Sequence, residues 1–516
     1  MALRTFATEA APGIRRLPRV RRESLVELCA ERGNDVLLGV GLVAVAAVLE
    51  IFLPHAFNVD SWLALVTGRE VWQSGVPHHE TLTALAQGAP WIDQQWLSQL
   101  LSYGTYLVGG LGLLGIVNVT LIIGAVAGCA IGARRLGASA RSVLLVLPLC
   151  AVIVALFSEV RTQEFVLPLF TATVYLLASD SRTPSRRVYW CLPLLVLWAN
   201  LHGTVVLGAV LVSLRGLTLA WERRARVRSS AQAWVRPLIL LLAAPATLLV
   251  TPYGLSIVSY YRGMLLGGAL RQMVTEWQPI TSEPAMAAMF FVLAGAALWA
   301  FGRYPARTTL WERVALVAMA AASIEVMRNA LFFALLAVLV LPLALPAGSS
   351  QRPMEWAARL RRARLNLGLA GLSLCAVLAL GATMLARPDS SVELVYQRTK
   401  ILQAVEHQTA VHPQLRVFAD VRFADWLLWR DPALQSRIAN DARFELLTTP
   451  QITRVRNVVD ALGADWKQGL RGFRLAVLDR RSSPRAVVGL LREPGHRVLY
   501  NDGQRIVILR APGGGR

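Results

Sequence analysis

A carboxylate just beyond the first apolar segment is the first residue in the chain that could do chemistry. The apolar segment 35–54 is followed at once by Asp60, inside the stretch 58–62. Ionisable groups near membrane depth are costly, so a functional role is the default interpretation. A carboxylate at the mouth of a membrane helix can accept a proton from an attacking hydroxyl group. Asp60 is therefore the predicted catalytic base.

Further polar and aromatic residues are predicted to bind substrate, because the order of the apolar segments places them on the same side of the membrane as Asp60. They are Trp62, Glu80, Arg161, Asn200, His202, Tyr253, Glu276, Trp277 and Arg328. For any single residue a structural role is an equal alternative. Glu159, Arg161 and Glu164 could form an ion network, and the tryptophans could anchor the protein at the interface. The whole set on one side favours function.

The sequence His78-His79-Glu80 has the side chains that bind metal ions. Three adjacent residues in a loop cannot all face one ion without a bent backbone, and helical spacings such as H-x3-H are absent. A solvated loop explains these residues better. No metal site is predicted from spacing.

The composition is that of a multipass membrane protein. The 516 residues are 55% hydrophobic and 16% charged, with a mean hydropathy of +0.48. A bilayer span needs about 20 nearly uninterrupted apolar residues, and such runs recur up to residue 386. The net charge of +21 comes largely from arginines in short loops between these runs. This pattern orients a membrane protein, so a nucleic-acid partner is excluded.

The apolar runs predict eleven transmembrane crossings. They lie at about 35–54, within 94–133, and at about 142–158, 165–178, 188–200, 204–221, 237–251, 284–301, 314–327, 329–345 and 366–386. The run 94–133 is interrupted by Gly109-Gly110, which predicts one crossing plus a surface or re-entrant helix. The segment 190–200 is only roughly 17 Å long as a helix, against a hydrocarbon core of about 30 Å. The turn at 200–203 is therefore expected to line a cavity.

Arginine placement predicts the orientation, because positively charged loops remain cytoplasmic. The basic residues 1–34 and every second loop are arginine-rich, whereas the opposite loops, including the first loop 55–93, contain few arginines. The membrane domain 35–386 is then followed by an outer tail, 387–516. Four short strands in this tail, separated by helical patterns, predict a small α/β domain. They are expected at 417–420, 473–479, 496–500 and 505–509.

Several motifs together carry a family resemblance. Those near the first segment are Asn58-Val59-Asp60-Ser61-Trp62, Gly68-Arg69, Gly75-Val76-Pro77, Glu80, Thr83, Gly88-Ala89-Pro90-Trp91 and Trp96-Leu97. Later ones are Trp198-Ala199-Asn200-Leu201-His202-Gly203, Pro252-Tyr253-Gly254, Glu276-Trp277, Arg328-Asn329, 417–429 and Asn440-Asp441-Ala442-Arg443. Over about residues 55–510 the chain resembles the multipass bacterial glycosyltransferases of the GT-C class, with a helical membrane domain and an outer domain. The Trp-Ala-Asn-Leu-His-Gly string is the most specific of these motifs.

The resemblance implies sugar transfer from a polyprenyl-phosphate donor to an envelope glycan, lipid or protein on the outer face of the bacterial inner membrane. Arg161 and Arg328 would then contact the phosphate, and Asp60 would be the base. A divalent metal is a possible cofactor in this family. The family's first acid is Asn58 here, its aromatic and His are Leu63 and Ala64, and its Glu before Trp96 is Gln95. Losing one carboxylate weakens a metal-dependent mechanism.

Two other function classes remain as alternatives. A transporter or flippase of lipid-linked sugars would also need a cavity with arginines, although no inverted repeat is visible in the sequence. A non-catalytic scaffold whose outer domain binds a partner is favoured slightly by the missing acid at Asn58. An Asp60 variant separates these alternatives, because a scaffold tolerates it and an enzyme does not.

Overall fold

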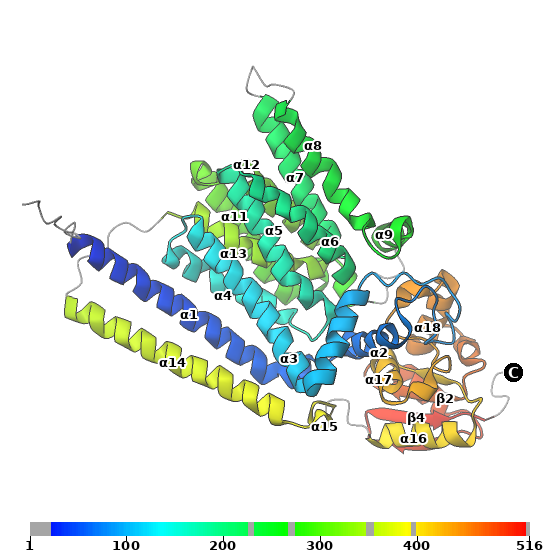
Figure 1. Ribbon diagram of the computed structural model, residues 1–516. Coiled ribbons are helices and arrows are strands. Elements are labelled where there is room, and N and C mark those ends of the chain that lie inside the picture. The colour runs from blue at the N-terminus through cyan, green and yellow to red at the C-terminus, as the bar shows by residue number, and fades with distance from the viewer. Residues whose placement is uncertain (1–21, 225–231, 267–273, 347–355, 394–398, 512–516) are drawn as a thin grey trace, which may run out of the picture.

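The computed structural model describes residues 22–224, 232–266, 274–346, 356–393 and 399–511. The helices of the apolar part are α1 (Arg22–Ala56), α2 (Val59–Ser74), α3 (Trp96–Arg135), α4 (Ala140–Leu156), α5 (Leu167–Arg182), α6 (Cys191–Leu201), α7 (Val205–Arg224), α8 (Gln232–Ala246), α9 (Ile257–Leu266), α11 (Pro284–Arg303), α12 (Leu310–Glu325), α13 (Ala330–Ala344) and α14 (Trp356–Ala386). Most pack into one bundle around the fully buried α13, while α1 and α14 lie side by side at its edge (Figure 1).

The number of membrane spans differs from the prediction. Among the described helices, four are long and apolar enough to cross a membrane: α3, α7, α11 and the segment Met327–Ala344. The pair Trp234–Leu249 and Gly254–Met264, bent by 101°, would make a fifth. Four to five candidate spans thus replace the eleven expected crossings. The reason is length: most other apolar runs form shorter helices, such as the 11-residue α6, which is roughly 17 Å long.

The two glycines that interrupt 94–133 break α3 into two helices. Gly109 has non-helical angles, and Gly110 has φ 64°, in the left-handed region that favours glycine. The side chain of Asp389, from α15 (Asp389–Val392), accepts a hydrogen bond from the backbone N–H of Leu111 at 2.9 Å. A Cβ at Gly110 would come within 2.8 Å of this carboxylate. The break is therefore built into the packing of the chain.

The predicted first loop contains a helix that the sequence analysis did not expect. Asn58 is the N-cap of α2: its side chain accepts the N–H of Ser61 at 3.3 Å, and the Ser61 hydroxyl accepts the N–H of Asn58 at 3.1 Å. Asparagine and serine are favoured in such a capping box. Asp60 then lies in the first turn, where a negative charge interacts favourably with the helix dipole.

The tail folds into a small α/β domain around a four-stranded sheet, as the sequence predicts. Its helices, besides α15, are α16 (Thr399–Val411), α17 (Val421–Arg430), α18 (Thr449–Asp460) and α19 (Pro484–Leu491). Its strands are β1 (Val417–Ala419), β2 (Leu475–Asp479), β3 (Arg497–Asn501) and β4 (Arg505–Leu509). The strand order is β1-β2-β4-β3, with β1 parallel to β2 and the other neighbours antiparallel.

The first loop is attached to this tail domain through backbone hydrogen bonds. Thr83 pairs with Ile438, and Ile438 pairs in turn with Val417 of β1. The N–H groups of Ala84 and Leu85 donate to the carbonyls of residues 438 and 439 at 2.7 and 3.0 Å. In Figure 1 the blue loop lies along the orange tail domain. The residues around Asp60 and the tail domain therefore form one continuous structure.

Candidate functional site

A cavity of about 630 Å³ lies between the helical part and the tail domain. Its walls come from segments far apart in the sequence: 58–64, 94–95, 159–162, 202–207, 260–264, 274–277, 326–329, 421–422 and 442–445. Asp60, Arg161, His202, Glu276, Trp277 and Arg328, all predicted as site residues, line it together. The volume lies within the ordinary range of ligand sites, about 300–1,000 Å³.

One buried guanidinium organises the polar wall. Arg161 is 5% exposed, and three carboxylates surround it. Its Nη1 lies 2.8 Å from Glu276 Oε2 and 3.6 Å from Asp60 Oδ2, and its Nη2 lies 2.9 Å from Glu159 Oε2. We call Arg161, Asp60, Glu159 and Glu276 the cavity cluster. The predicted contact between Arg161 and phosphate stays a prediction. In this structure the Arg161 guanidinium is paired with carboxylates instead.

Local backbone contacts fix this cluster to the start of α2. The N–H of Val160 donates to the carbonyl of Ala56 at 2.9 Å, and the hydroxyl of Ser61 donates to the carbonyl of Val160. The side-chain amide of Asn58 donates to Glu159 at 2.6 Å. Arg161 is thereby held one residue before the short 3-10 helix Thr162–Val166, facing Asp60.

The Asp60 carboxylate faces the cavity. Its side chain lines the cavity and is 45% exposed. Partial removal from water raises the pKa of Asp60 above its ordinary value, while Arg161 acts in the opposite direction. A carboxylate with a raised pKa is a stronger base, which suits proton abstraction.

Arg328 is the second cation of the cavity and differs from Arg161 in its partners. It donates a hydrogen bond to the side chain of Gln163, and its guanidinium lies 5.5 Å from the centre of the Trp277 ring. Within the described part of the chain it makes no ion pair with a carboxylate. Arg328 therefore remains available to an anionic ligand.

Two further titratable groups near this wall are neutral at neutral pH. Neither carboxylate oxygen of Glu164 has a hydrogen-bond partner among the described residues, and burial raises the pKa of Glu164 to about 8. Burial lowers the pKa of His202, helped by the nearby arginines, and the ring is hydrogen-bonded to Thr204 at 3.0 Å. Neutral side chains here limit the charge that the bundle must bury.

The tail domain supplies cavity residues that the prediction did not include. Arg443, Phe444 and Glu445 line the cavity opposite the helices, and burial raises the pKa of Glu445 to about 7. Arg443 also holds the first loop, through Glu80 at 2.7 Å and by stacking over Trp91 at 4.2 Å. The motif 440–443 was noted in the sequence, but no local signal shows that it faces Asp60.

Four residues predicted to bind substrate lie outside the cavity lining. Trp62 is fully buried beside Phe57, and Glu80 is the buried ion-pair partner of Arg443. Their neighbours are protein, so no sugar can stack on Trp62 in this arrangement.

Asn200 and Tyr253 are likewise occupied by protein contacts. The Asn200 amide donates to the carbonyls of Val196 and Val250 at 2.9 Å, and its oxygen accepts from the Trp96 indole at 3.2 Å. The Tyr253 hydroxyl donates to the carbonyl of Pro77 at 2.8 Å. Both residues secure turns that border the site. The expected cavity at the 200–203 turn is present, lined by His202 and Gly203.

Metal-ligand geometry is not found in the described ranges. They contain no group of three His, Cys, Asp or Glu side chains that could hold a metal ion. Of the His78-His79-Glu80 sequence, Glu80 turns toward Arg443, and the His78 ring packs on Tyr253 at 5.4 Å.

Comparison with known proteins places the fold. No family model matches the chain, and no curated protein matches it in sequence. Two structures of the Archaeoglobus fulgidus oligosaccharyltransferase are similar at 11% identity over 92% of this chain and 74% of theirs: the apo form, with a TM-score of 0.49, and AglB in complex with an inhibitory peptide and a dolichol-phosphate, with 0.50. ArnT from Cupriavidus metallidurans is 13% identical over 91% and 98% of the two chains, with a TM-score of 0.48.

The likeness to AglB shows the fold class. The likeness extends over 92% of this chain, so it includes both the mostly helical apolar part and the tail with its four-stranded sheet. At this level of identity the likeness extends to the fold alone.

Proposed function

We propose that this protein is an inverting membrane glycosyltransferase. It moves a sugar from a polyprenyl-phosphate-linked donor to a glycan, lipid or protein of the cell envelope. The observation that carries the proposal is the cavity in which Asp60 lies beside a carboxylate-bound arginine and Arg328 faces the open space. The fold likeness supports it, because AglB was solved with a dolichol-phosphate bound.

In this proposal each cavity group has one task. The acceptor oxygen attacks the anomeric carbon while the bond from that carbon to the phosphate oxygen breaks. The proton of the acceptor hydroxyl passes to Asp60, and the polyprenyl phosphate leaves with the bonding electrons. Arg328 is the cation assigned to the phosphate, because a guanidinium pairs with phosphate oxygens in a bidentate manner. Trp277, whose ring lies 5.5 Å from that guanidinium, holds it in place.

The apolar cavity wall suits a lipid-linked donor. Val206 and Leu207 at the start of α7, with Tyr260, Tyr261 and Met264 of α9, add apolar and aromatic surface to a cavity that is otherwise lined by polar and charged residues. The α8–α9 pair belongs to the bent segment that qualifies as a possible span. A ligand with a charged head and an apolar chain matches this combination of surfaces.

The tail domain is proposed to help bind the acceptor. Arg422 and residues 442–445 of the tail domain line the same cavity as α7 and α9. In this proposal the tail lies outside the bacterial inner membrane and the amino terminus in the cytoplasm, as the distribution of arginines among the loops predicts. The acceptor would then be a component of the envelope.

A deletion strain tests this function. Its envelope glycans are analysed after expression of the wild type, Asp60→Asn or Arg328→Ala, with protein levels checked by blot. Asp35→Asn is the matched control, because Asp35 forms an ion pair with Arg134 in the helical part outside the cavity. We expect the wild type and the control to restore a missing sugar, and the two cavity variants not to. If both cavity variants fully restore the missing sugar, the proposal of an enzyme is overturned and a non-catalytic scaffold is favoured.

A further inference from the structure

In the cavity cluster, three carboxylates surround one cation, and that cation is a side chain of the protein. Carboxylate oxygens of Asp60, Glu159 and Glu276 approach the terminal nitrogens of Arg161 at 2.8–3.6 Å. The three acids come from three different parts of the chain, and each side chain is at least partly exposed to the cavity. Converging carboxylates repel one another unless a positive charge or a bound proton offsets the repulsion, and here the positive charge is that of Arg161.

A divalent metal ion does not fit the cluster as it is built. Oxygen ligands lie about 2.0–2.6 Å from Mg²⁺ or Ca²⁺, at the centre of their ligand set. That centre is filled by the guanidinium of Arg161, which is 5% exposed and fixed by the backbone of residues 157–161. Asn58 provides no oxygen either, because it caps α2 and its amide points its N–H at Glu159.

We propose that Arg161 is the fixed cation of this site, holding Asp60, Glu159 and Glu276 where a metalloenzyme would use a divalent ion, so that transfer requires no metal. This inference rests on the proposed function. Arg161 is a positioning residue: it orients the Asp60 carboxylate through charge and does not itself contact the reacting atoms. A guanidinium suits the task because it stays charged when buried.

The electrostatics of the cluster agree with this role. Burial by itself would lower the pKa of Arg161, but Glu276 and Glu159 outweigh it and raise that pKa. Burial by itself would raise the pKa of Glu276, but Arg161 outweighs it and the pKa is lowered. Arg161 and Glu276 are therefore a stable charged pair, whereas Asp60, at 3.6 Å, is held more loosely and keeps its basicity.

Binding of Mn²⁺ to the full-length protein in lipid nanodiscs tests the proposal without any assay of transfer. Free and bound Mn²⁺ are separated by electron paramagnetic resonance. The wild type, Arg161→Lys and Arg328→Ala should have no stoichiometric site. Arg161→Ala removes the cation between the three carboxylates, which can then close on a metal ion, so this variant should gain one site with affinity at least tenfold above the wild type. The double variant Arg161→Ala, Glu276→Gln should lose it again.

Each result of the binding experiment decides the question. A wild-type Mn²⁺ site that disappears in Glu276→Gln would overturn the proposal, and so would an Arg161→Ala protein that elutes as a single species but gains no site. If Arg161→Ala does not fold, the comparison of the wild type with Glu276→Gln still decides: no Mn²⁺ site dependent on Glu276 supports the proposal.

The activity measurement adds a response that a merely structural role would not produce. Wild-type transfer should be unchanged by EDTA. Arg161→Ala should lose activity about 100-fold, within the range of general-base contributions, and Mn²⁺ should restore part of it; Arg161→Lys should retain more. Loss of wild-type transfer in EDTA, reversed by Mn²⁺, would overturn the proposal. A wild type with no transfer at all would instead contradict the proposed function and leave the Mn²⁺ result standing.

Discussion

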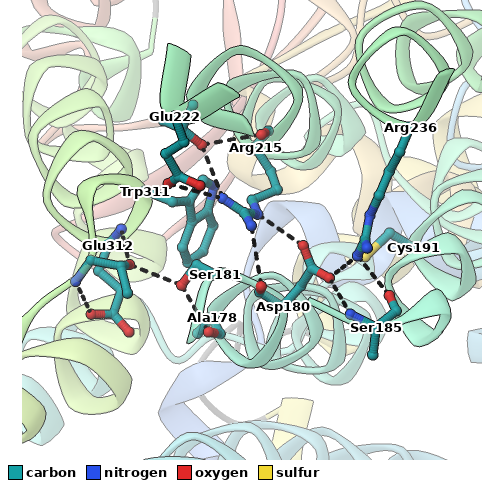
Figure 2. A network of polar contacts seen from close by, with 12 residues as sticks. Ala178, Asp180, Ser181, Ser185, Cys191, Arg215, Glu222, Arg236, Trp311 and Glu312 are labelled. Atoms are coloured by element: carbon teal, nitrogen blue, oxygen red, sulfur yellow. Dashed lines mark hydrogen bonds and ion pairs between the residues drawn. The ribbon is translucent and has the colours of Figure 1, made fainter. Parts of the chain in front are cut away.

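Two buried arginine–carboxylate clusters in this protein use the same residue types for different ends. The closed cluster consists of Asp180 on α5, Arg215 on α7 and Arg236 on α8 (Figure 2). Arg215 donates to the Asp180 carboxylate at 2.9 Å, Arg236 pairs with its other oxygen, and the N–H of Ser185 donates to that oxygen at 2.9 Å. Two arginines thus serve one buried carboxylate, and the more exposed Glu222 lies 3.5 Å from Arg215 at the edge of the cluster.

The cavity cluster has the opposite ratio, with one arginine serving three carboxylates. Its acids are 26–45% exposed to a cavity, whereas Asp180 and Arg215 are at most 1% exposed. Both oxygens of the buried Asp180 carboxylate are paired with arginines, so neither is left for a ligand, and the role of this cluster is to fix helix packing. An excess of exposed negative charge beside a cavity is unfavourable for stability alone, which indicates chemistry. The ratio of charges and the exposure distinguish the two clusters.

The largest expected effect is on activity, in the cavity cluster. Asp60→Asn should lower sugar transfer by about 10²–10⁴-fold, the range that a general base contributes, with an unchanged thermal midpoint. Asp180→Asn should show the reverse, lowering the thermal midpoint with little change in transfer per folded molecule. The two variants are compared by transfer assays and thermal unfolding in the same nanodiscs. If Asp60→Asn and Asp180→Asn lower sugar transfer equally, the proposed difference between the two clusters is wrong.

The next largest effect is on stability, in the closed cluster. Arg215→Ala leaves Asp180 buried with only part of its partners, so it should cost about 3–5 kcal/mol. Glu222→Gln is the control, because Glu222 is 37% exposed and lies 3.5 Å from Arg215, which predicts a cost of about 0–1 kcal/mol. Denaturant titration in detergent measures both. Equal costs would mean that burial does not set the strength of this cluster.

A smaller effect is expected where the cavity meets the donor. Arg328→Lys keeps the charge but loses the planar fork and the contact over Trp277. The KM for the lipid-linked donor should rise about tenfold, equivalent to roughly one charge-assisted hydrogen bond, with kcat nearly unchanged. Arg134→Lys, outside the cavity, is the control and should alter neither constant. A fall in kcat alone would argue against a role in donor binding.

The smallest effect concerns Asp93, a buried acid near the cavity without an arginine partner. Burial raises its pKa to about 7, against hydrogen bonds from the backbone of Gln95 and the side chain of Gln99. The unfolded state ionises near pH 4, so this residue's stabilisation is present below pH 4 and is lost as pH rises through 7. Asp93→Asn should flatten the decline in thermal midpoint between pH 4 and 7, by about 2 °C. Parallel curves of thermal midpoint against pH for the wild type and Asp93→Asn would contradict the raised pKa of Asp93.

Local patterns in the sequence predicted the secondary structure well and the number of membrane spans poorly. The apolar runs and the four tail strands correspond to helices and strands because periodicity and turn residues act over a few neighbours. The helix α2 was missed although its capping residues Asn58 and Ser61 were visible, since the surrounding polar residues suggested a loop. The eleven crossings were overestimated because apolar character does not fix where helices end, as the 11-residue α6 illustrates.

The candidate site was likewise predicted only in part from the sequence. Residue type alone marked Asp60, Arg161, His202, Glu276, Trp277 and Arg328, because ionisable and amphipathic groups are rare in apolar surroundings. Only the tertiary structure decided that Trp62 and Glu80 turn into the protein, that Arg443 reaches the cavity, and that Arg161 is shared by three carboxylates. The physical reason is range: helix formation is set by neighbours in the chain, whereas the partner of a buried charge is set by packing between segments far apart in it.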